Sequence, residues 1–366
     1  MPNALPPIPP IRQDRELGNL LAQATLAIGR LDGAIEILPN PDLFVFMYVR
    51  KEAVLSSQIE GTQSSLADLL EAEASLLDAD RPADVAEVIN YVNAMNYGLE
   101  RLASLPVSTR LIREIHERLM SGARGAQWRP GEIRTSQNWI GPGGSTLADA
   151  TFVPPPPHLV PHCLGELENF LHGETEYHEL VRVALAHAQF ETIHPFLDGN
   201  GRVGRLLISF LLCEKKILQK PVLYLSRYFS GNRAAYYDRL QAVRTDGDWE
   251  GWLKFFLRGV EDVALAAAAT AKAIIALRES HRRRIHEAFE GRAGNAVRLV
   301  DALFQRPIMN VGEVSEVIGQ TYQAANSLVG ELTRLEILRE ITGQRRNRAF
   351  EYGAYVDLFT DRRSGR

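Results

Sequence analysis

The sequence predicts a mainly α-helical protein of three parts, and three observations predict that class. Apolar residues recur at the 3.6-residue spacing of a helix over most of the chain up to about residue 290. Capping signals separate these stretches, as where Ser65 precedes Asp68 by three residues. Extended, glycine-rich sequence is confined to residues 134–153 and to the last 75 or so residues. At 366 residues, with 45% hydrophobic and 23% charged positions, the chain is long enough for about two or three domains.

The composition excludes several classes of protein. The chain has 41 Lys and Arg and 45 Asp and Glu, which gives a formal charge of −4. It therefore has no general attraction for nucleic acid or anionic lipid. The net charge does not exclude a local basic patch. No apolar stretch is long enough to span a membrane and the proline-rich start lacks a secretory pattern, so we expect a cytoplasmic protein. We expect Cys163 and Cys213 to be reduced thiols. His158 and His162 beside Cys163 lack helical ligand spacing and a fourth ligand, which disfavours zinc.

We predict an N-terminal helical region over residues 1–105. A proline-rich arm precedes the first amphipathic helix. The second helix follows a turn at residues 39–41 and ends at Gly61. Ser65 and Asp68 have the spacing of a capping box before the third helix, and Pro82 opens the fourth. The predicted helices cover residues 14–31, 44–59, 66–77 and 82–95.

The next predicted part, residues 106–258, is a helical core interrupted by a hairpin. A helix is expected from Thr109 to Met120. Residues 134–140 and 150–153 have the pattern of strands on either side of a Gly-Pro-Gly-Gly turn, which predicts a β-hairpin. Helical periodicity resumes at Leu159. Alanine-rich sequence then predicts a long connecting helix, which we place at residues 259–289.

The last part, residues 290–366, has the pattern of a winged helix, with three short helices and a small hairpin around an arginine-rich turn at residues 343–348. It carries 11 Arg and 10 Asp or Glu, a difference of +1, whereas a DNA reader is usually more basic. Contact with DNA phosphates and docking to a protein both stay open. The helices are expected at residues 297–304, 311–318 and 322–335, and the strands at 337–341 and 349–352.

The residues most indicative of chemistry lie between Ile193 and Arg205. Helical sequence precedes this segment and an apolar helical stripe follows Val203, so the segment is a tight loop between two buried helices. Gly199 and Gly201 allow backbone angles that turn several N–H groups toward one point at the start of the second helix. Such a helix start binds anions, above all phosphate.

Four side chains of this segment fit chemistry on a polyphosphate. Arg202 and Arg205 are three apart, share a helix face and can bind neighbouring phosphoryl oxygens. Asp198 supplies the oxygen ligand that Mg²⁺ prefers, and His194 can take a proton from an attacking hydroxyl at neutral pH. Each residue alone has an ordinary structural explanation, such as a turn or a helix cap. Together they favour a catalytic site.

The segment resembles, residue for residue, the signature of the Fic family, His-x-Phe-x-Asp/Glu-Gly-Asn-Gly-Arg-x-x-Arg. The resemblance implies a mainly helical Fic core and an ATP-dependent protein adenylyltransferase. Such an enzyme moves AMP from ATP to a Ser, Thr or Tyr hydroxyl and releases pyrophosphate. The implied roles are general base for His194, Mg²⁺ ligand for Asp198, phosphate cradle for Gly199, Asn200 and Gly201, and β- and γ-phosphate binding for Arg202 and Arg205.

The resemblance extends over most of the chain. The predicted hairpin resembles the family's flap, which holds a target segment by strand addition, and Trp139 and Ile140 would press on that segment. A hairpin that only packs on its own domain stays the alternative. Tyr236 and Tyr237 resemble tyrosines that line the adenine pocket. Arg244 departs from the pattern, because some relatives have an adenine-contacting Asn there.

A second motif lies just before Gly61. Ser56 and Glu60 are four apart and share a helix face. Glu60 ends the helix, where the macrodipole disfavours its negative charge, so a basic partner would relieve it. In isolation this is an ordinary helix stop. The family's inhibitory helix reads Ser/Thr-x-x-x-Glu-Gly/Asn, so by resemblance residues 52–61 carry the inhibitor and Glu60 pairs with Arg205.

Three hypotheses about function remain. The first is adenylylation of a target protein, or of the chain itself, restrained by Glu60. The second is removal of AMP from a modified protein at the same site, with Glu60 aligning water. The third is a DNA-binding regulator whose core only senses ATP. We expect ATP, Mg²⁺ and a target protein as partners and no membrane, while a homodimer stays open.

Overall fold

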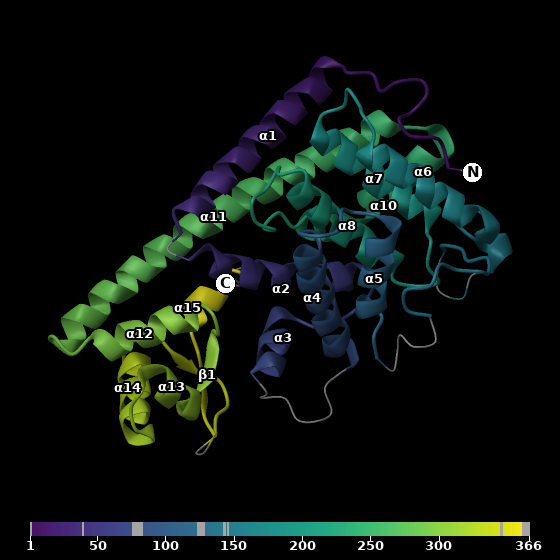
Figure 1. Ribbon diagram of the computed structural model, residues 1–366. Coiled ribbons are helices and arrows are strands. Elements are labelled where there is room, and N and C mark those ends of the chain that lie inside the picture. Colours follow the sequence, from purple (N-terminus) through teal and green to yellow (C-terminus); the bar gives the residue numbers. More distant parts are fainter. Residues whose placement is uncertain are drawn as a thin grey trace.

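A computed structural model describes residues 2–38, 40–74, 83–122, 129–141, 144, 146–344 and 347–360. It is mainly α-helical, as the sequence predicts (Figure 1). The helices are α1 Arg15–Glu36, α2 Pro41–Ile59, α3 Leu66–Glu73, α4 Ala83–Arg101, α5 Thr109–Leu119, α6 Val160–His172, α7 Glu179–Ile193, α8 Asn200–Glu214, α9 Ser226–Gly231, α10 Arg233–Asp246, α11 Trp249–Phe289, α12 Gly294–Leu303, α13 Val311–Ile318, α14 Tyr322–Arg334 and α15 Gly353–Val356. The strands are β1 Ile308–Asn310, β2 Arg339–Glu340 and β3 Ala349–Glu351, and 3₁₀ turns occur at Leu147–Asp149 and Pro157–Leu159.

The first helices begin at the predicted caps. Asp14 accepts a hydrogen bond from the Leu17 N–H at 2.7 Å, which caps α1. The predicted capping box of Ser65 and Asp68 is present at α3. Side-chain oxygens thus satisfy N–H groups that the helix itself leaves unpaired.

Two predicted helix ends differ from the structure. The first helix was expected to end at residue 31, but α1 continues to Glu36 because Ala34 and Ile35 keep its apolar face buried. The third was expected to reach residue 77, but α3 ends at Glu73. Residues 75–82, which include the predicted opening at Pro82, lie outside the described residues.

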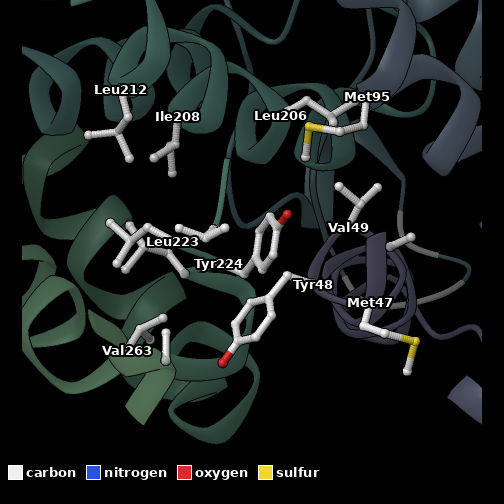
Figure 2. Packing of buried hydrophobic residues seen from close by; sticks show 14 of the residues in the cluster. Met47, Tyr48, Val49, Met95, Leu206, Ile208, Leu212, Leu223, Tyr224 and Val263 are labelled. Atoms are coloured by element: carbon white, nitrogen blue, oxygen red, sulfur yellow. The ribbon is translucent and has the colours of Figure 1, made fainter. Parts of the chain in front are cut away.

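Helix α2 lies in the middle of the molecule, packed against α4, α8 and α9. Figure 2 shows its residues Tyr48 and Val49 among side chains of other elements. The ring of Tyr48 stacks on Tyr224 with centroids 5.5 Å apart, and Met95 of α4 is buried completely. Packing of this kind excludes water from the helix and fixes its position. The helix that ends at Glu60 is therefore anchored in the core.

The long helices α1 and α11 run side by side along one edge of the molecule (Figure 1). Lys254 of α11 binds both Asp14 and Glu16 at 2.7 Å, which ties the start of α1 to α11. Helix α11 is continuous over 41 residues. The boundary expected between a core ending at residue 258 and a connecting helix starting at 259 therefore falls inside one helix. None of the helices in the described ranges is long and apolar enough to cross a membrane.

The predicted β-hairpin is wrong in its extent. Residues 134–140 and 150–153 form no ladder; Ile140 and Phe152 make one antiparallel bridge, with N···O distances of 2.9 and 3.0 Å. The reason is that Arg134 turns toward the core: its N–H donates to the Pro195 carbonyl at 2.9 Å and its guanidinium to the carbonyl of His194 at 2.8 Å. Of the turn, residues 142–143 lie outside the described residues.

The C-terminal unit contains the predicted helices and strands, and in addition strand β1 and the short helix α15. Helices α12, α13 and α14 pack with a sheet of order β1-β3-β2, in which both pairs are antiparallel. Strand β1 was not predicted, because it is three residues long and α13 begins directly after it. Residues 345–346 of the arginine-rich turn lie outside the described residues. The unit contacts α11 where His281 Nδ1 lies 2.9 Å from the Tyr352 hydroxyl oxygen.

Candidate active site

The motif loop joins α7 to α8 through two residues with left-handed backbone. His194 ends α7 with φ of 50° and Gly199 precedes α8 with φ of 76°. Asn200 holds the loop closed, since its Oδ1 accepts from the Phe196 N–H and its Nδ2 donates to the Phe196 carbonyl, both at 2.8 Å. The first N–H groups of α8 have no partner within the helix and point outward from its start. The loop therefore has the form of a phosphate cradle.

His116 of α5 supports this loop, and the sequence prediction missed it. Its ring stacks on Phe196 with centroids 3.7 Å apart, and its Nε2 lies 3.1 Å from the Asp198 carbonyl. Burial, only partly offset by that carbonyl, lowers the pKa of His116 to about 4, so the ring is neutral at pH 7. Its position on the apolar face of α5, four residues after Ile112, was the only signal available.

His194 is also neutral at pH 7. Burial and the nearby Arg244 lower its pKa to about 4, against the opposing effect of Glu60. Its Nδ1 is buried and has no hydrogen-bond partner within the described part of the chain. A neutral imidazole can accept a proton, as a general base must.

Asp198 and Arg202 lie at the opening of the cradle. The Asp198 side chain is 45% exposed, its Oδ1 accepts from the Gly199 N–H at 2.7 Å and its Oδ2 lies 3.8 Å from Arg202. Arg202 also pairs with Glu87 of α4 at 3.2 Å. No cluster of three or more His, Cys, Asp or Glu within the described ranges could hold a metal by itself. Asp198 thus provides a single accessible carboxylate.

Arg205 is buried and bound to the end of α2. Its Nε donates to Ser56 Oγ at 2.8 Å, and its Nη2 donates to the Ser56 carbonyl at 2.9 Å and to Glu60 Oε1 at 2.8 Å. Burial, the largest single influence, would raise the pKa of Glu60, but the charge and hydrogen bond of Arg205, together with the charge of Arg202, lower it overall, so Glu60 is ionised. A Cβ added to Gly201 would lie 2.3 Å from Glu60 Oε1, so a larger residue would force this carboxylate to shift.

Two further carboxyl groups lie near Arg205, and the sequence prediction missed both. Glu52 of α2 is 2% exposed and accepts from the hydroxyls of Ser226, at 2.5 Å, and Tyr91, at 3.2 Å. Glu191 of α7 is 5% exposed. Burial raises the pKa of each to about 7, although Arg205 acts in the opposite direction. Unlike Glu60, these groups carry a proton for much of the time near neutral pH.

The residues predicted to contact adenine and those predicted to lie in the flap differ in how exposed their side chains are. Tyr236 is buried, with its hydroxyl 2.9 Å from His187 Nε2, whereas the Tyr237 side chain is exposed. Of the two tyrosines predicted to line the adenine pocket, only Tyr237 is exposed, and the role of both stays a prediction. Trp139 is exposed and Ile140 is half-buried beside the single bridge.

Arg244 links the flap segment, by which we mean residues 134–141 and 146–153, to the end of α7. It donates to the Glu191 carbonyl at 3.0 Å, and its guanidinium lies 4.1 Å from the centre of the Phe152 ring. A cavity of about 310 Å³ adjoins it, lined also by Asn3 of the N-terminal arm. This stacking holds the Phe152 ring against the protein's own domain, while the Trp139 side chain stays exposed.

Two family models match the chain. Residues 19–100 match the model described as Fic/DOC family N-terminal, and residues 106–212 match the model described as Fic/DOC family. The second match contains the whole motif from His194 to Arg205, and the first contains Ser56 and Glu60. These two regions of the chain are Fic/DOC family domains.

Curated relatives are similar over part of the chain. A probable protein adenylyltransferase of Aquifex aeolicus is 33% identical over 198 residues, which cover 52% of this chain and 56% of that relative. The protein adenylyltransferase Fic of Aedes aegypti is 30% identical over 204 residues, which cover 54% of this chain and 37% of that relative. The chain thus spans about half or less of the length of these relatives.

Solved structures share the fold. A Fic family protein from Desulfovibrio desulfuricans aligns with a TM-score of 0.62 at 20% identity, over 93% of this chain and 97% of that one. Fic-1 from C. elegans aligns with a TM-score of 0.50 at 22% identity, over 71% and 73% of the two chains. The first likeness extends over nearly the whole chain.

Proposed function

We propose that this protein transfers AMP from ATP to a hydroxyl group of a protein. The acceptor oxygen forms a bond to the α-phosphorus, the bond from that phosphorus to the β-phosphate bridging oxygen breaks, and pyrophosphate leaves. His194 takes the proton of the acceptor hydroxyl. The observation that supports this best is the convergence of a neutral histidine, an accessible carboxylate and two arginines on one helix start. The printed names of the curated relatives agree with this reaction.

Phosphate binding follows from the same geometry. The N-terminus of α8, with Gly199, Asn200 and Gly201, would hold phosphoryl oxygens, and Arg202 and Arg205 would hold the β- and γ-phosphates. Asp198 would hold Mg²⁺ together with those phosphates, because a lone accessible carboxylate suits an ion that is commonly bound through one or two carboxylates and substrate phosphates. When bound, Mg²⁺ would neutralise part of the phosphate charge.

We propose that Glu60 and Ser56 inhibit the transfer in cis. All three hydrogen bonds given above for Arg205 come from α2, so its guanidinium is occupied by an internal anion. A γ-phosphate would have to compete with that anion, and ATP would bind in a less productive position. The same carboxylate could align water for the reverse reaction, removal of AMP from a modified protein, which stays the second candidate.

The target would meet the flap segment. Trp139 and Tyr237 present exposed rings, and Ile140 holds the one bridge that an added strand could extend. We propose that Tyr237 contacts the adenine and that Trp139 and Ile140 contact the target protein. The target can be a second protein or another copy of this chain, and we propose a cytoplasmic setting for it.

The C-terminal unit is proposed to be a winged helix that docks partners. Helices α12, α13 and α14 and the three-stranded sheet support this class. The near balance of charge over residues 290–366 favours a protein partner over DNA. A DNA-binding regulator that senses ATP is the third candidate. Sequence-preferring binding of the wild-type protein to a DNA fragment at physiological salt would favour it.

Incubation with ATP labelled on the α-phosphate separates the candidates. Label transfer to protein supports adenylylation, loss of label from pre-labelled protein supports the reverse reaction, and neither result favours the regulator. In the same assay His194→Ala should abolish transfer, while ATP binding measured by calorimetry stays nearly unchanged, since the phosphates are held elsewhere. Loss of ATP affinity in this variant would mean that His194 is structural.

A further inference from the structure

The imidazole ring of His116 joins the motif loop to the chain just before the flap segment. His116 lies on α5, which packs against α4, α6 and α8, and it is completely buried. Its Nδ1 is 2.8 Å from the Gly131 nitrogen, and its Nε2 is 3.1 Å from the Asp198 carbonyl oxygen. One ring therefore contacts two segments that are far apart in the sequence.

These two contacts determine which ring nitrogen carries the proton. A backbone N–H can only donate a hydrogen bond, so Nδ1 of His116 accepts from Gly131 and carries no hydrogen. The ring is then neutral, and Nε2 donates its proton to the Asp198 carbonyl. Gly131 is itself held to α5, because Arg113 donates through Nε to its carbonyl at 2.8 Å. The donor that faces Asp198 is thus fixed in place before any ligand binds.

The peptide group between Asp198 and Gly199 is held at both of its polar atoms. Its carbonyl accepts from His116, and its N–H donates to Asp198 Oδ1 at 2.7 Å. Because a peptide group is planar, the direction of the carbonyl sets the direction of the N–H and with it the position of the carboxylate. The second oxygen, Oδ2, lies 3.8 Å from Arg202 at the opening of the cradle. His116 therefore acts on the carboxylate through the backbone.

The start of α8 has a separate support. Asn200 bonds to the backbone of Phe196 in both directions at 2.8 Å, and these bonds do not involve His116. The His116 ring stacks on Phe196 with centroids 3.7 Å apart, and a Cβ added to Gly199 would lie 3.6 Å from its Nε2. Loss of the single hydrogen bond to Asp198 should therefore disturb the carboxylate more than the N–H groups of α8.

We propose that His116 is a positioning residue for Asp198, and that its Nε2–H holds the carboxylate where it can bind Mg²⁺ together with the phosphates of ATP. This inference rests on the proposed function, because that function assigns Mg²⁺ and ATP to the site. His116 itself contacts neither of them and takes no part in the proton transfer assigned to His194. Hydrogen-bond partners of a metal-binding carboxylate commonly change metal affinity about tenfold or more when they are removed.

Two amide variants separate the two hydrogen bonds of the ring. His116→Gln carries a nitrogen donor as far along the side chain as Nε2, so it can still donate to Asp198. His116→Asn carries an oxygen as far along the side chain as Nδ1, so it can still accept from Gly131 but is too short to reach Asp198. A purely structural role of the ring predicts that both variants suffer alike. His281→Asn is the control, because His281 is also buried and contacts Tyr352 of the C-terminal unit.

Calorimetry of ATP binding measures the effect without any transfer reaction. The parent is the full chain with Glu60→Gly, so that Glu60 does not compete with phosphate for Arg205. ATP is titrated with Mg²⁺ and again with EDTA, and the ratio of the two affinities is the gain due to Mg²⁺. His116→Asn should reduce this gain about tenfold and leave the affinity in EDTA unchanged. His116→Gln and His281→Asn should keep the gain of the parent.

Several calorimetric outcomes would overturn the proposal. They are an undiminished gain in His116→Asn, equal losses in the two His116 variants, and a parent without any gain due to Mg²⁺. Circular dichroism checks that each variant is folded. ¹⁵N NMR of the histidine rings tests the geometry in the parent itself, where His116 should be neutral and protonated at Nε2. Its signal is assigned by its absence from either variant, and a proton on Nδ1 would contradict the proposal.

Label transfer distinguishes failure of this proposal from failure of the proposed function. If the parent binds ATP with Mg²⁺ but transfers no label, the proposed function fails, and the calorimetric difference still decides the role of His116. If transfer occurs, His116→Asn should need about tenfold more Mg²⁺ for its half-maximal rate. It should regain the rate of the parent at saturating Mg²⁺, because His194 is unchanged. A lower maximal rate at an unchanged Mg²⁺ requirement would contradict a role through Asp198.

Discussion

Arg202 and Arg205 lie one turn apart on α8, and each pairs with a glutamate from the N-terminal region, yet the two pairs differ. Arg205 has a 2% exposed side chain and receives its three contacts from α2 alone. Arg202 makes one 3.2 Å contact with Glu87, whose side chain is 27% exposed, and its Nε is buried without a hydrogen-bond partner in the described residues.

This difference assigns separate roles to the two arginines, phosphate binding to one and regulation to the other. Exposure to water does not separate the two pairs, because the Glu60 side chain is 32% exposed and that of Glu87 is 27% exposed. The pairs differ in number and origin of contacts: those of Arg205 are charge-assisted and concentrated on one helix end, so a change in α2 alters all of them together. We infer that regulation acts through Arg205, while Arg202 stays ready for phosphate.

The largest effect is expected from Glu60→Gly. Removal of this carboxylate frees Arg205 from a charge-assisted contact worth about 1.5 to 3 kcal/mol, so adenylylation should rise about 10- to 100-fold. Initial rates of label transfer at saturating ATP and Mg²⁺ measure this. The double variant with Arg205→Ala should show no gain, since freeing an absent arginine has no effect. An unchanged rate in Glu60→Gly alone would refute inhibition in cis.

A smaller rise is expected from Ser56→Ala. This variant removes the hydroxyl that accepts from Arg205 Nε and keeps both the carbonyl of residue 56 and Glu60. Loss of one hydrogen bond of about 1 kcal/mol should raise transfer about fivefold. Ser57→Ala serves as the matched control, because Ser57 is buried in the same helix but its hydroxyl has no partner in the described part of the chain. Equal effects of the two variants would show that the hydroxyl of Ser56 has no special role.

Glu87→Gln should change the transfer rate less than about threefold, as expected for a partly exposed ion pair. The same label-transfer assay measures it, at several ATP concentrations. A rise in transfer rate as large as that of Glu60→Gly would contradict the difference between the two arginines. It would mean that the Glu87 pair inhibits transfer as strongly as the Glu60 pair.

The last prediction concerns stability and the buried carboxyl of Glu52 in α2. Burial raises the pKa of Glu52 to about 7, against the opposing hydrogen bond from Ser226 and the charge of Arg205. The folded state therefore binds this proton more tightly than the unfolded chain. The resulting stability is complete below about pH 4.5 and is lost as pH rises through 7.

Glu52→Gln imitates the protonated acid and removes this dependence. Its free energy of unfolding, from urea titrations between pH 5 and 8, should fall less with rising pH than that of wild type. The buried histidines destabilise both proteins equally as pH falls below 6.5, so they cancel in the difference. Parallel curves for the two proteins would show that Glu52 is ionised throughout.

Local patterns predicted the parts of this protein whose interactions are close in sequence. The capping box at Ser65, the helix stop at Gly61 and the loop around Gly199 depend on a few neighbouring residues, and each is present. The hairpin prediction was wrong in extent because an extended pattern does not show which residues will hydrogen-bond to it. Arg134 bonds to the motif loop, 60 residues away, and no ladder forms.

The sequence by itself determined the helical class, the tight loop between α7 and α8 and, through two short motifs, the expectation that Glu60 meets Arg205. It could not show that Glu52 and Glu191 are buried or that His116 supports the loop. These features are made by side chains brought together from separate helices, so only tertiary packing decides their burial, their charge and the space between them.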